Sequence, residues 1–239
     1  MEDADYVKSD DSKSAALYYC ITAFVLLLFV ASACFIRLLA PVYEKPLHGN
    51  IKELLIYLTV IILWLCELTA AALFCKNRFK FNLLWNDEKK SRLPILNFIV
   101  IWVLIYGAIL LVSGILGWQL KIFHDLGTKI TFYEIYTVLS LVLLRAVESV
   151  IICAFIKCTE EAAKRLIPVR LPIPYGGIAL FLTYGIGVYV YSGSALGLYG
   201  GGELSLLFWL FCILYGVIYK LSKESFPVTS ILIWFVLVL

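Results

Sequence analysis

The hydrophobic pattern of this chain consists of long apolar stretches separated by short polar segments. Six stretches are long enough to cross a bilayer as helices when read with a window of about 19 residues. They cover residues 15–40, 51–75, 94–117, 130–156, 173–193 and 203–222. A strand of a transmembrane barrel would instead show about ten residues of alternating hydrophobicity. The pattern therefore predicts an all-α integral membrane protein, a bundle of six to seven transmembrane helices.

A seventh apolar stretch begins at Phe226 and continues to Leu239, the last residue of the sequence. Its helix would extend about 21 Å at about 1.5 Å per residue, whereas the hydrocarbon core of a bilayer is about 30 Å thick. We therefore expect either a half-span or a fragment of a longer protein. The sequence divides into an acidic tail over residues 1–14 and a single polytopic domain over residues 15–239.

Composition agrees with this class, because 62% of the residues are hydrophobic and 15% are charged. A soluble domain has about 45–50% apolar and about 25% charged residues. The tail MEDADYVKSDDSKS is acidic where a presequence would be basic, and the first apolar stretch is longer than a signal-peptide core. We expect the first apolar stretch to act as an uncleaved signal anchor that directs the chain into the endoplasmic reticulum pathway. The lipid bilayer is then a predicted partner of the chain.

Lysine and arginine residues are distributed unequally between the two sets of predicted loops. The tail and loops 76–93, 157–172 and 220–225 hold fourteen of them, whereas the opposite set of loops holds five. Cytoplasmic loops carry the excess of Lys and Arg in membrane proteins. The N terminus is therefore predicted to be cytoplasmic. The net charge of +3 follows from this bias and does not indicate nucleic acid.

Motifs of known enzyme classes are missing from the sequence. The two histidines, His48 and His124, lie in predicted external loops and outside any metal-binding spacing. No Gly-x-Ser-x-Gly elbow and no P-loop occurs. We therefore expect no catalytic residue, no metal site and no cofactor, and the chain is not predicted to be an enzyme.

The polar residues inside the apolar stretches are the strongest functional signal. Arg145 and Glu148 lie in the middle of span 130–156 and are spaced i, i+3, so they share one helix face and can pair. Glu67 lies in span 51–75, nine residues before Lys76, just as Glu148 lies nine residues before Lys157. Because these two spans run in the same direction, Glu67 and Glu148 are predicted to lie at the same depth.

If Glu67 and Glu148 face each other, two carboxylates share the guanidinium of Arg145. Such a site suits a small solute, a cation or a proton, since an intramembrane ionisable residue usually serves transport or ligand capture. Glu67, Arg145 and Glu148 are therefore the candidate residues for binding a substrate or ion. The alternative is a buried ion network that only fixes the register of the helices.

Small and aromatic residues have two interpretations each. The glycines of spans 94–117 and 173–193 indicate either close helix packing or a bendable, broken helix. The tyrosines near both ends of span 173–193 are interpreted as interface anchors. Cys75 and Cys158, at the predicted cytoplasmic ends of their spans, are candidates for reversible lipidation or small apolar core residues.

The second to fourth spans, with a basic loop 76–93 and a charged span 130–156, resemble the extra N-terminal membrane domain of some ABC exporters, although the Gly-rich fifth span departs from that pattern. We predict a small multispan membrane protein that handles a solute or ion through a mid-membrane charged site. The alternatives are a non-catalytic accessory or scaffold subunit that binds other membrane proteins, and the N-terminal membrane domain of a larger transporter. An integral membrane enzyme ranks third.

The loop charges lead to a testable topology. A cysteine introduced at Asn86 and one introduced at Ser194 should react differently with a membrane-impermeant thiol reagent in intact cells, because the two loops lie on opposite sides. The measured quantity is the amount of reagent that each cysteine variant takes up beyond the amount taken up by the parent protein. Equal labelling at both positions would contradict the predicted orientation.

Overall fold

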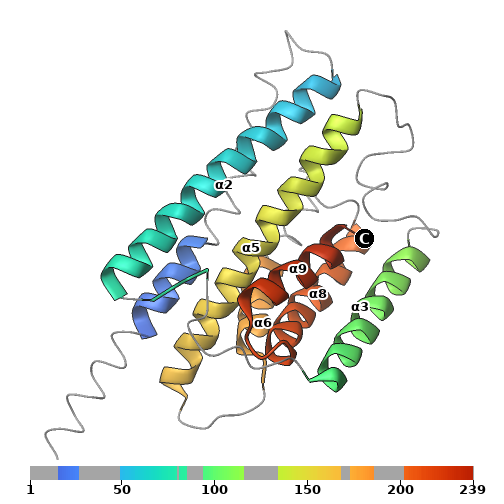
Figure 1. Ribbon diagram of the computed structural model, residues 1–239. Coiled ribbons are helices and arrows are strands. Elements are labelled where there is room, and N and C mark those ends of the chain that lie inside the picture. Colours follow the sequence, from blue (N-terminus) through green and yellow to red (C-terminus); the bar gives the residue numbers. More distant parts are fainter. Residues whose placement is uncertain are drawn as a thin grey trace, which may run out of the picture.

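The computed structural model describes residues 16–26, 49–79, 81–84, 94–115, 134–167, 173–185 and 202–238. Every regular element within these residues is helical (Figure 1), which confirms the all-α prediction for this part of the chain. The elements are a first helix Ala16–Leu26, α2 Gly49–Phe79, α3 Ile95–Ile115, α5 Glu134–Leu166, α6 Tyr175–Leu180, the π-helix η2 Phe181–Gly185, α8 Gly202–Leu221 and α9 Phe226–Val238.

Two of the described helices are long and apolar enough to cross a membrane: Leu54–Asn77 of α2 and Val138–Leu166 of α5. The six to seven spans predicted from the sequence are therefore not confirmed, because the other apolar helices are shorter within the described residues. The apolar character of α5 agrees with its burial, since 72% of its most apolar stretch is buried inside the protein. The corresponding share in α2 is 28%. Membrane association is thus indicated weakly, and mainly by α2.

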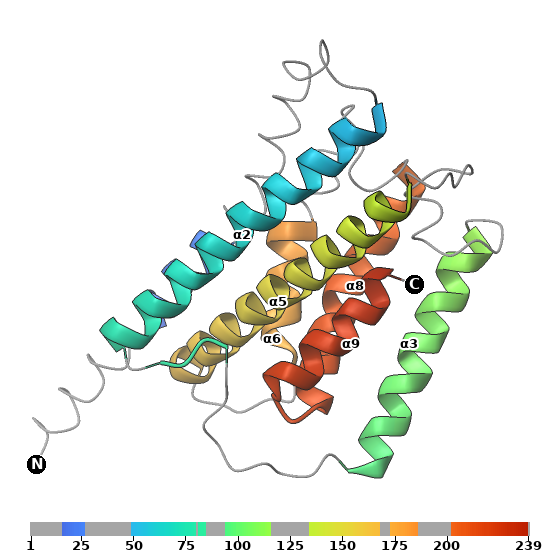
Figure 2. The same cartoon turned by 45° about the horizontal axis from the view of Figure 1, so that its top comes forward.

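Helix α5 lies in the middle of the bundle and contacts α2, α6, α8 and α9. Figures 1 and 2 show α2 along one side of α5, with α8 and α9 on the other side. Helix α3 is outermost and packs on α8 and α9. This arrangement covers α5 with protein on several sides, so polar groups on α5 are shielded by other helices.

The face of α2 toward the core follows helical periodicity. Its buried side chains recur at every third or fourth position, which places them in one stripe. They are Tyr57, Val60, Ile61, Trp64, Leu68, Ala71 and Cys75. The residues between them, such as Leu58, Ile62 and Leu73, are exposed although they are apolar. The outer face of α2 is therefore suited to lipid or to another apolar surface.

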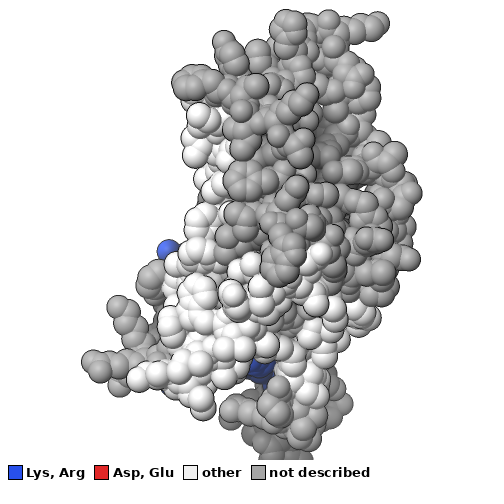
Figure 3. All heavy atoms as spheres, turned by 90° about the vertical axis from the view of Figure 1, so that its right-hand side faces the viewer, with Lys and Arg blue, Asp and Glu red and all other residues white. Residues whose placement is uncertain are grey.

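Helix α3 exposes even more apolar surface than α2. Ile95, Leu96, Val103 and Tyr106 each leave more than half of their surface uncovered, from 62% to 78%. Figure 3 shows this side of the molecule, where the described atoms include few charged side chains. An apolar patch of this extent marks an interaction surface for lipid or protein.

Glycines bring α6 into contact with α5 and α8. A Cβ added at Gly177 would lie 2.9 Å from the Cα of Gly216 in α8, and one added at Gly176 would lie 2.7 Å from Ile156 of α5. Real Cβ atoms essentially never approach so closely. Only glycine fits at these contacts, so close packing, one of the two interpretations of the Gly-rich fifth span, holds at its start.

The helix ends that precede and follow the predicted cytoplasmic loops meet at one end of the bundle. Lys157 Nζ of α5 donates to the carbonyl of Asn82, which follows α2, at 2.6 Å. Asn97 Nδ2 of α3 donates to the carbonyl of Leu221 in α8 at 2.9 Å. These contacts join the chain segments next to loops 76–93, 157–172 and 220–225, which the charge pattern assigns to one side.

The turn between α8 and α9 uses left-handed backbone without glycine. Lys223 has φ 54° and Glu224 has φ 60°. The Glu224 N–H donates to Tyr219 O at 2.9 Å and the Lys223 N–H to Lys220 O at 3.0 Å, which is the pattern of a Schellman motif. A left-handed non-glycine residue costs about 1–2 kcal/mol. Contacts of the turn residues with other helices must therefore hold this conformation.

We expect Gly216→Ala to lower the free energy of unfolding by about 1–3 kcal/mol, because the new Cβ would lie 2.5 Å from the Cα of Gly177. The thermal midpoint in detergent measures the change. Gly107→Ala is the matched control, since nothing lies within 4 Å of its added Cβ. That variant should gain about 0.5–1 kcal/mol from helix propensity. Equal midpoints for both variants would show that α6 and α8 do not pack this closely.

Candidate functional site

Arg145 and Glu148 form a buried ion pair within α5. The Nη1 atom of Arg145 lies 2.8 Å from Oε2 of Glu148, and the side chains are 5% and 1% exposed. The i, i+3 spacing places both groups on one helix face. The pairing predicted from the sequence thus forms, and both of its side chains are covered by the rest of the protein.

Tyr184 completes this cluster, which we call the central site (Arg145, Glu148 and Tyr184). Its hydroxyl donates a hydrogen bond to Oε1 of Glu148 at 2.7 Å. Each oxygen of the Glu148 carboxylate therefore has a donor, one from its own helix and one from the neighbouring segment. The interface interpretation covered the tyrosines near both ends of this span, and the sequence analysis did not single out Tyr184. Its position in the middle of span 173–193, far from both ends, was the available signal.

The segment that carries Tyr184 is irregular. Helix α6 continues after Leu180 as the π-helix η2, Phe181–Gly185. A π turn inserts an extra residue, which rotates the following side chains relative to an α-helix, and such turns occur frequently at functional sites. Close packing, one of the two interpretations of the fifth span, thus applies at Gly176 and Gly177, and η2 departs from regular α-helix within a continuous helical segment.

Glu67 does not join the central site. No hydrogen bond or ion pair connects it with Arg145 or Glu148 in the described part of the chain. It lies next to the buried stripe of α2, is half-buried, and its Oε2 atom is buried without a hydrogen-bond partner. The arrangement in which two carboxylates share one guanidinium is therefore not formed. Counting residues along the helices gives depth, but it does not give the rotation of α2.

The two candidate lipidation residues are core residues in this conformation. Cys75 is 1% exposed and Cys158 is 0% exposed. The Sγ atom of Cys75 lies 3.7 Å from Oγ1 of Thr22 in the first helix. A buried thiol is out of reach of an acyltransferase, so lipidation at either position requires local opening of the bundle.

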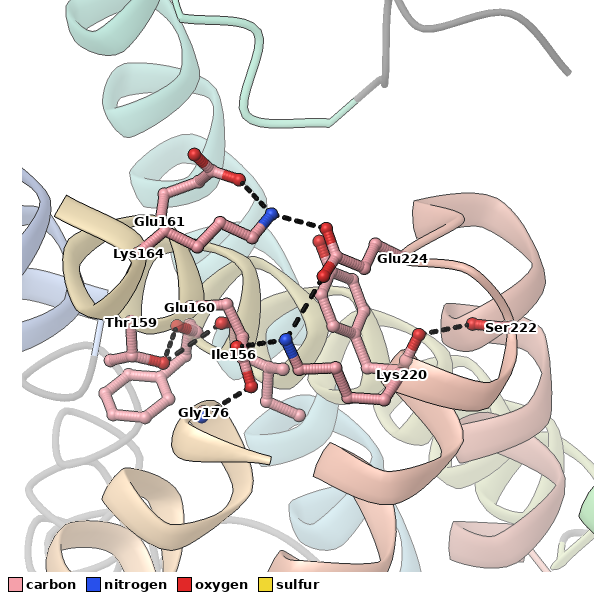
Figure 4. Close-up of polar contacts among 11 residues, drawn as sticks. Ile156, Thr159, Glu160, Glu161, Lys164, Gly176, Lys220, Ser222 and Glu224 are labelled. Atoms are coloured by element: carbon pink, nitrogen blue, oxygen red, sulfur yellow. Dashed lines mark hydrogen bonds and ion pairs between the residues drawn. The ribbon is translucent and has the colours of Figure 1, made fainter. Parts of the chain in front are cut away.

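A second polar cluster, which we call the helix-end network, lies where α5, α6, α8 and α9 meet (Figure 4). Lys220 Nζ of α8 lies 2.6 Å from Glu160 Oε2 and 3.2 Å from Glu224 Oε1. Lys164 Nζ of α5 pairs with Glu161 Oε1 at 2.8 Å and with Glu224 Oε2. The sequence indicated Lys164 and Lys220 only as topology charges, because their partners come from distant positions in the chain.

Glu160 connects this network with α6. Its side chain is 1% exposed, and its Oε1 accepts a hydrogen bond from the Gly176 N–H at 3.0 Å. Glu224 holds the left-handed turn between α8 and α9 against the end of α5. Burial raises the pKa of Glu224, but the hydrogen bond from Lys164 and the charges of Lys164 and Lys220 outweigh burial and keep this pKa below its ordinary value.

Among the described residues, no three His, Cys, Asp or Glu side chains come together in a way that could hold a metal ion. No protein-family model, no curated protein and no solved structure matches this chain.

The pKa of Glu224 predicts a pH dependence of stability. A carboxyl whose pKa is lowered by folding stabilises the fold above its unfolded pKa and loses that contribution as the pH falls through the folded pKa. Glu224→Gln should therefore lower the thermal midpoint at neutral pH. The difference from the parent protein should shrink as the pH falls from about 5 to about 3.

Glu161→Gln is the matched control for this experiment, because Glu161 is as exposed as Glu224 and also pairs with Lys164, but within one helix. Such a pair contributes about 0.3–0.5 kcal/mol. Its effect should be the smaller one at neutral pH. A Glu224→Gln effect that stays constant down to pH 3 would contradict the assignment.

Proposed function

We propose that this chain is a small multispan membrane protein that handles a small solute or cation through the central site. In this proposal, six or seven helices cross the bilayer, with the N terminus cytoplasmic. The exposed apolar faces of α2 and α3 support it, since lipid is the environment in which such faces are stable. The observation that carries the function is the buried Arg145–Glu148 pair contacted by Tyr184.

The cost of burying this pair supports a role beyond packing. Moving an ion out of water costs several kcal/mol even when it is paired, and two apolar residues in its place are often as stable or more stable. The pair would therefore be retained for chemistry. A carboxylate at this depth offers oxygen ligands to a cation or an ammonium group, and the guanidinium offers donors to an anionic group.

The link with η2 favours a working site over a register-fixing network. A pair that only fixed register would have no need of an irregular segment next to it. Here the carboxylate of Glu148 contacts Tyr184 in a π turn, the kind of local distortion that accompanies binding sites. In a transporter, interrupted helices often flank the substrate site.

A second candidate function is that of an accessory subunit in a larger membrane complex. The observation in its favour is on α3, where Gly107 and Gly114 lie seven residues apart on an exposed stretch and nothing lies within 4 Å of a Cβ added at either. Small residues let a second helix approach closely in a membrane. Copurification of a partner in a fixed ratio would favour the subunit, whereas cation or solute uptake by the purified chain in liposomes would favour transport.

A pair of variants tests the central site. Arg145→Leu leaves Glu148 buried without its cation and should cost about 3–5 kcal/mol of stability, the magnitude found for one-sided loss of a buried pair. Arg145→Leu combined with Glu148→Leu should recover much of that stability, because it removes both charges. Thermal midpoint and liposome uptake are measured for both proteins. Under our proposal the double variant folds and is inactive; a stable and fully active double variant would exclude these residues from function.

A further inference from the structure

Two carboxylates of α5 hold the same neighbouring segment, which consists of α6 and η2 and covers residues 175–185. Glu160 accepts the Gly176 N–H at the start of the segment and pairs with Lys220 through its other oxygen. Glu148 accepts the Tyr184 hydroxyl near the end of the segment and pairs with Arg145 through its other oxygen. Each carboxylate thus uses one oxygen for the segment and the other for a cationic side chain.

The start of this segment has no room to move. A Cβ at Gly176 would lie 2.7 Å from the carbonyl oxygen and from Cγ2 of Ile156, and one at Gly177 would lie 3.0 Å from the carbonyl oxygen of Ile213. Backbone therefore packs on backbone at this point, against both α5 and α8. Rotation or translation of α6 would create clashes with one of the two helices.

The end of the segment has a different character. Leu182 and Thr183 are exposed, and the π turn lacks the regular hydrogen-bond pattern of α6. The Tyr184 hydroxyl reaches Glu148 from this turn. A change from π to α geometry moves the side chains that follow by about one residue. A change of conformation in η2, which also packs on α8, would therefore alter the contact with Glu148.

We propose that Tyr184 is the gate of the central site: its hydroxyl occupies the Glu148 oxygen that a monovalent cation or a primary ammonium group takes when η2 moves away. This inference rests on the proposed function and names its substrate class. The displaced group is a hydrogen-bond donor on a carboxylate oxygen, so its replacement must be electropositive. A monovalent cation is favoured over a divalent one because Arg145 already neutralises Glu148 and each added charge costs more in a buried site.

Tyr184→Phe is the central test, because it keeps the ring and removes the hydroxyl. The thermal midpoint of the whole protein in detergent is measured at increasing concentrations of Na⁺ or methylammonium. A bulky organic cation keeps the ionic strength constant. A ligand that binds the folded state raises this midpoint. In Tyr184→Phe the cation no longer has to displace a hydroxyl that is hydrogen-bonded to the charged Glu148. The cation concentration that gives half of the maximal rise in midpoint should therefore fall about tenfold. Tyr175→Phe, at the start of the same segment, is the matched control and should leave this concentration unchanged.

Hydrogen–deuterium exchange supplies a second measurement that needs no variant. In the parent protein, saturating cation should speed exchange of the amides in Phe181–Gly185 and leave those in Tyr175–Leu180 unchanged. Exchange that slows in Phe181–Gly185, or that speeds equally along both parts, would overturn the gate. This result stands even if Tyr184→Phe fails to fold.

The outcomes separate the gate from the proposed function. In one outcome, cation raises the midpoint of the parent but not that of Glu148→Gln, and Tyr184→Phe has the same half-maximal cation concentration as the parent. The gate is then wrong, and the cation site at Glu148 remains. If neither the parent nor Tyr184→Phe responds to either cation, cation handling at this site fails and the gate fails with it.

Discussion

The contact of α6 with α5 and α8 determines the position of both polar clusters. Because Gly176, Gly177 and Gly216 carry no side chains, the three helices approach to backbone contact. At this separation the carboxylate of Glu160 reaches a main-chain N–H of α6, and the carboxylate of Glu148 reaches the hydroxyl of Tyr184. A wider spacing would leave two buried carboxylates of α5 each with fewer donors, which is costly in a low-dielectric interior.

The features that the sequence predicted are those set by the periodicity of one helix. Arg145 and Glu148 are three residues apart, and the regular geometry of α5 brings them together. Close packing at Gly176 and Gly177 was one of two interpretations of the small residues in span 173–193, and the structure selects it there. Glu67 and Glu148 were predicted to lie at the same depth, but contact between two helices also depends on the rotation of each, which depth does not supply.

The features that the sequence did not predict depend on irregular backbone or on distant partners. Tyr184 reaches Glu148 from a π turn, and no pattern of hydrophobic residues marks where an α-helix widens. Lys220 and Glu160 are sixty positions apart, and both lie near predicted loops where charge is expected to be solvated. Their pairing requires that the ends of α5 and α8 meet, which is a property of the tertiary packing.

The two polar clusters differ in what the surrounding protein makes them able to do. In the helix-end network, the lysines are 26% and 36% exposed and reach solvent, whereas the Glu160 carboxylate is 1% exposed and stays buried against the Gly176 N–H. In the central site, both partners are almost fully covered, and any exchange must supply a new charge or donor as the old one leaves. The helix-end network therefore suits a fixed anchor for α6, whereas under the proposed function the central site changes state when a ligand replaces a protein group. Since α5 is covered by protein where it carries these charges, a ligand of the proposed site would arrive between helices, and η2, which packs on α8 and presents Tyr184 to Glu148, is the segment beside that carboxylate.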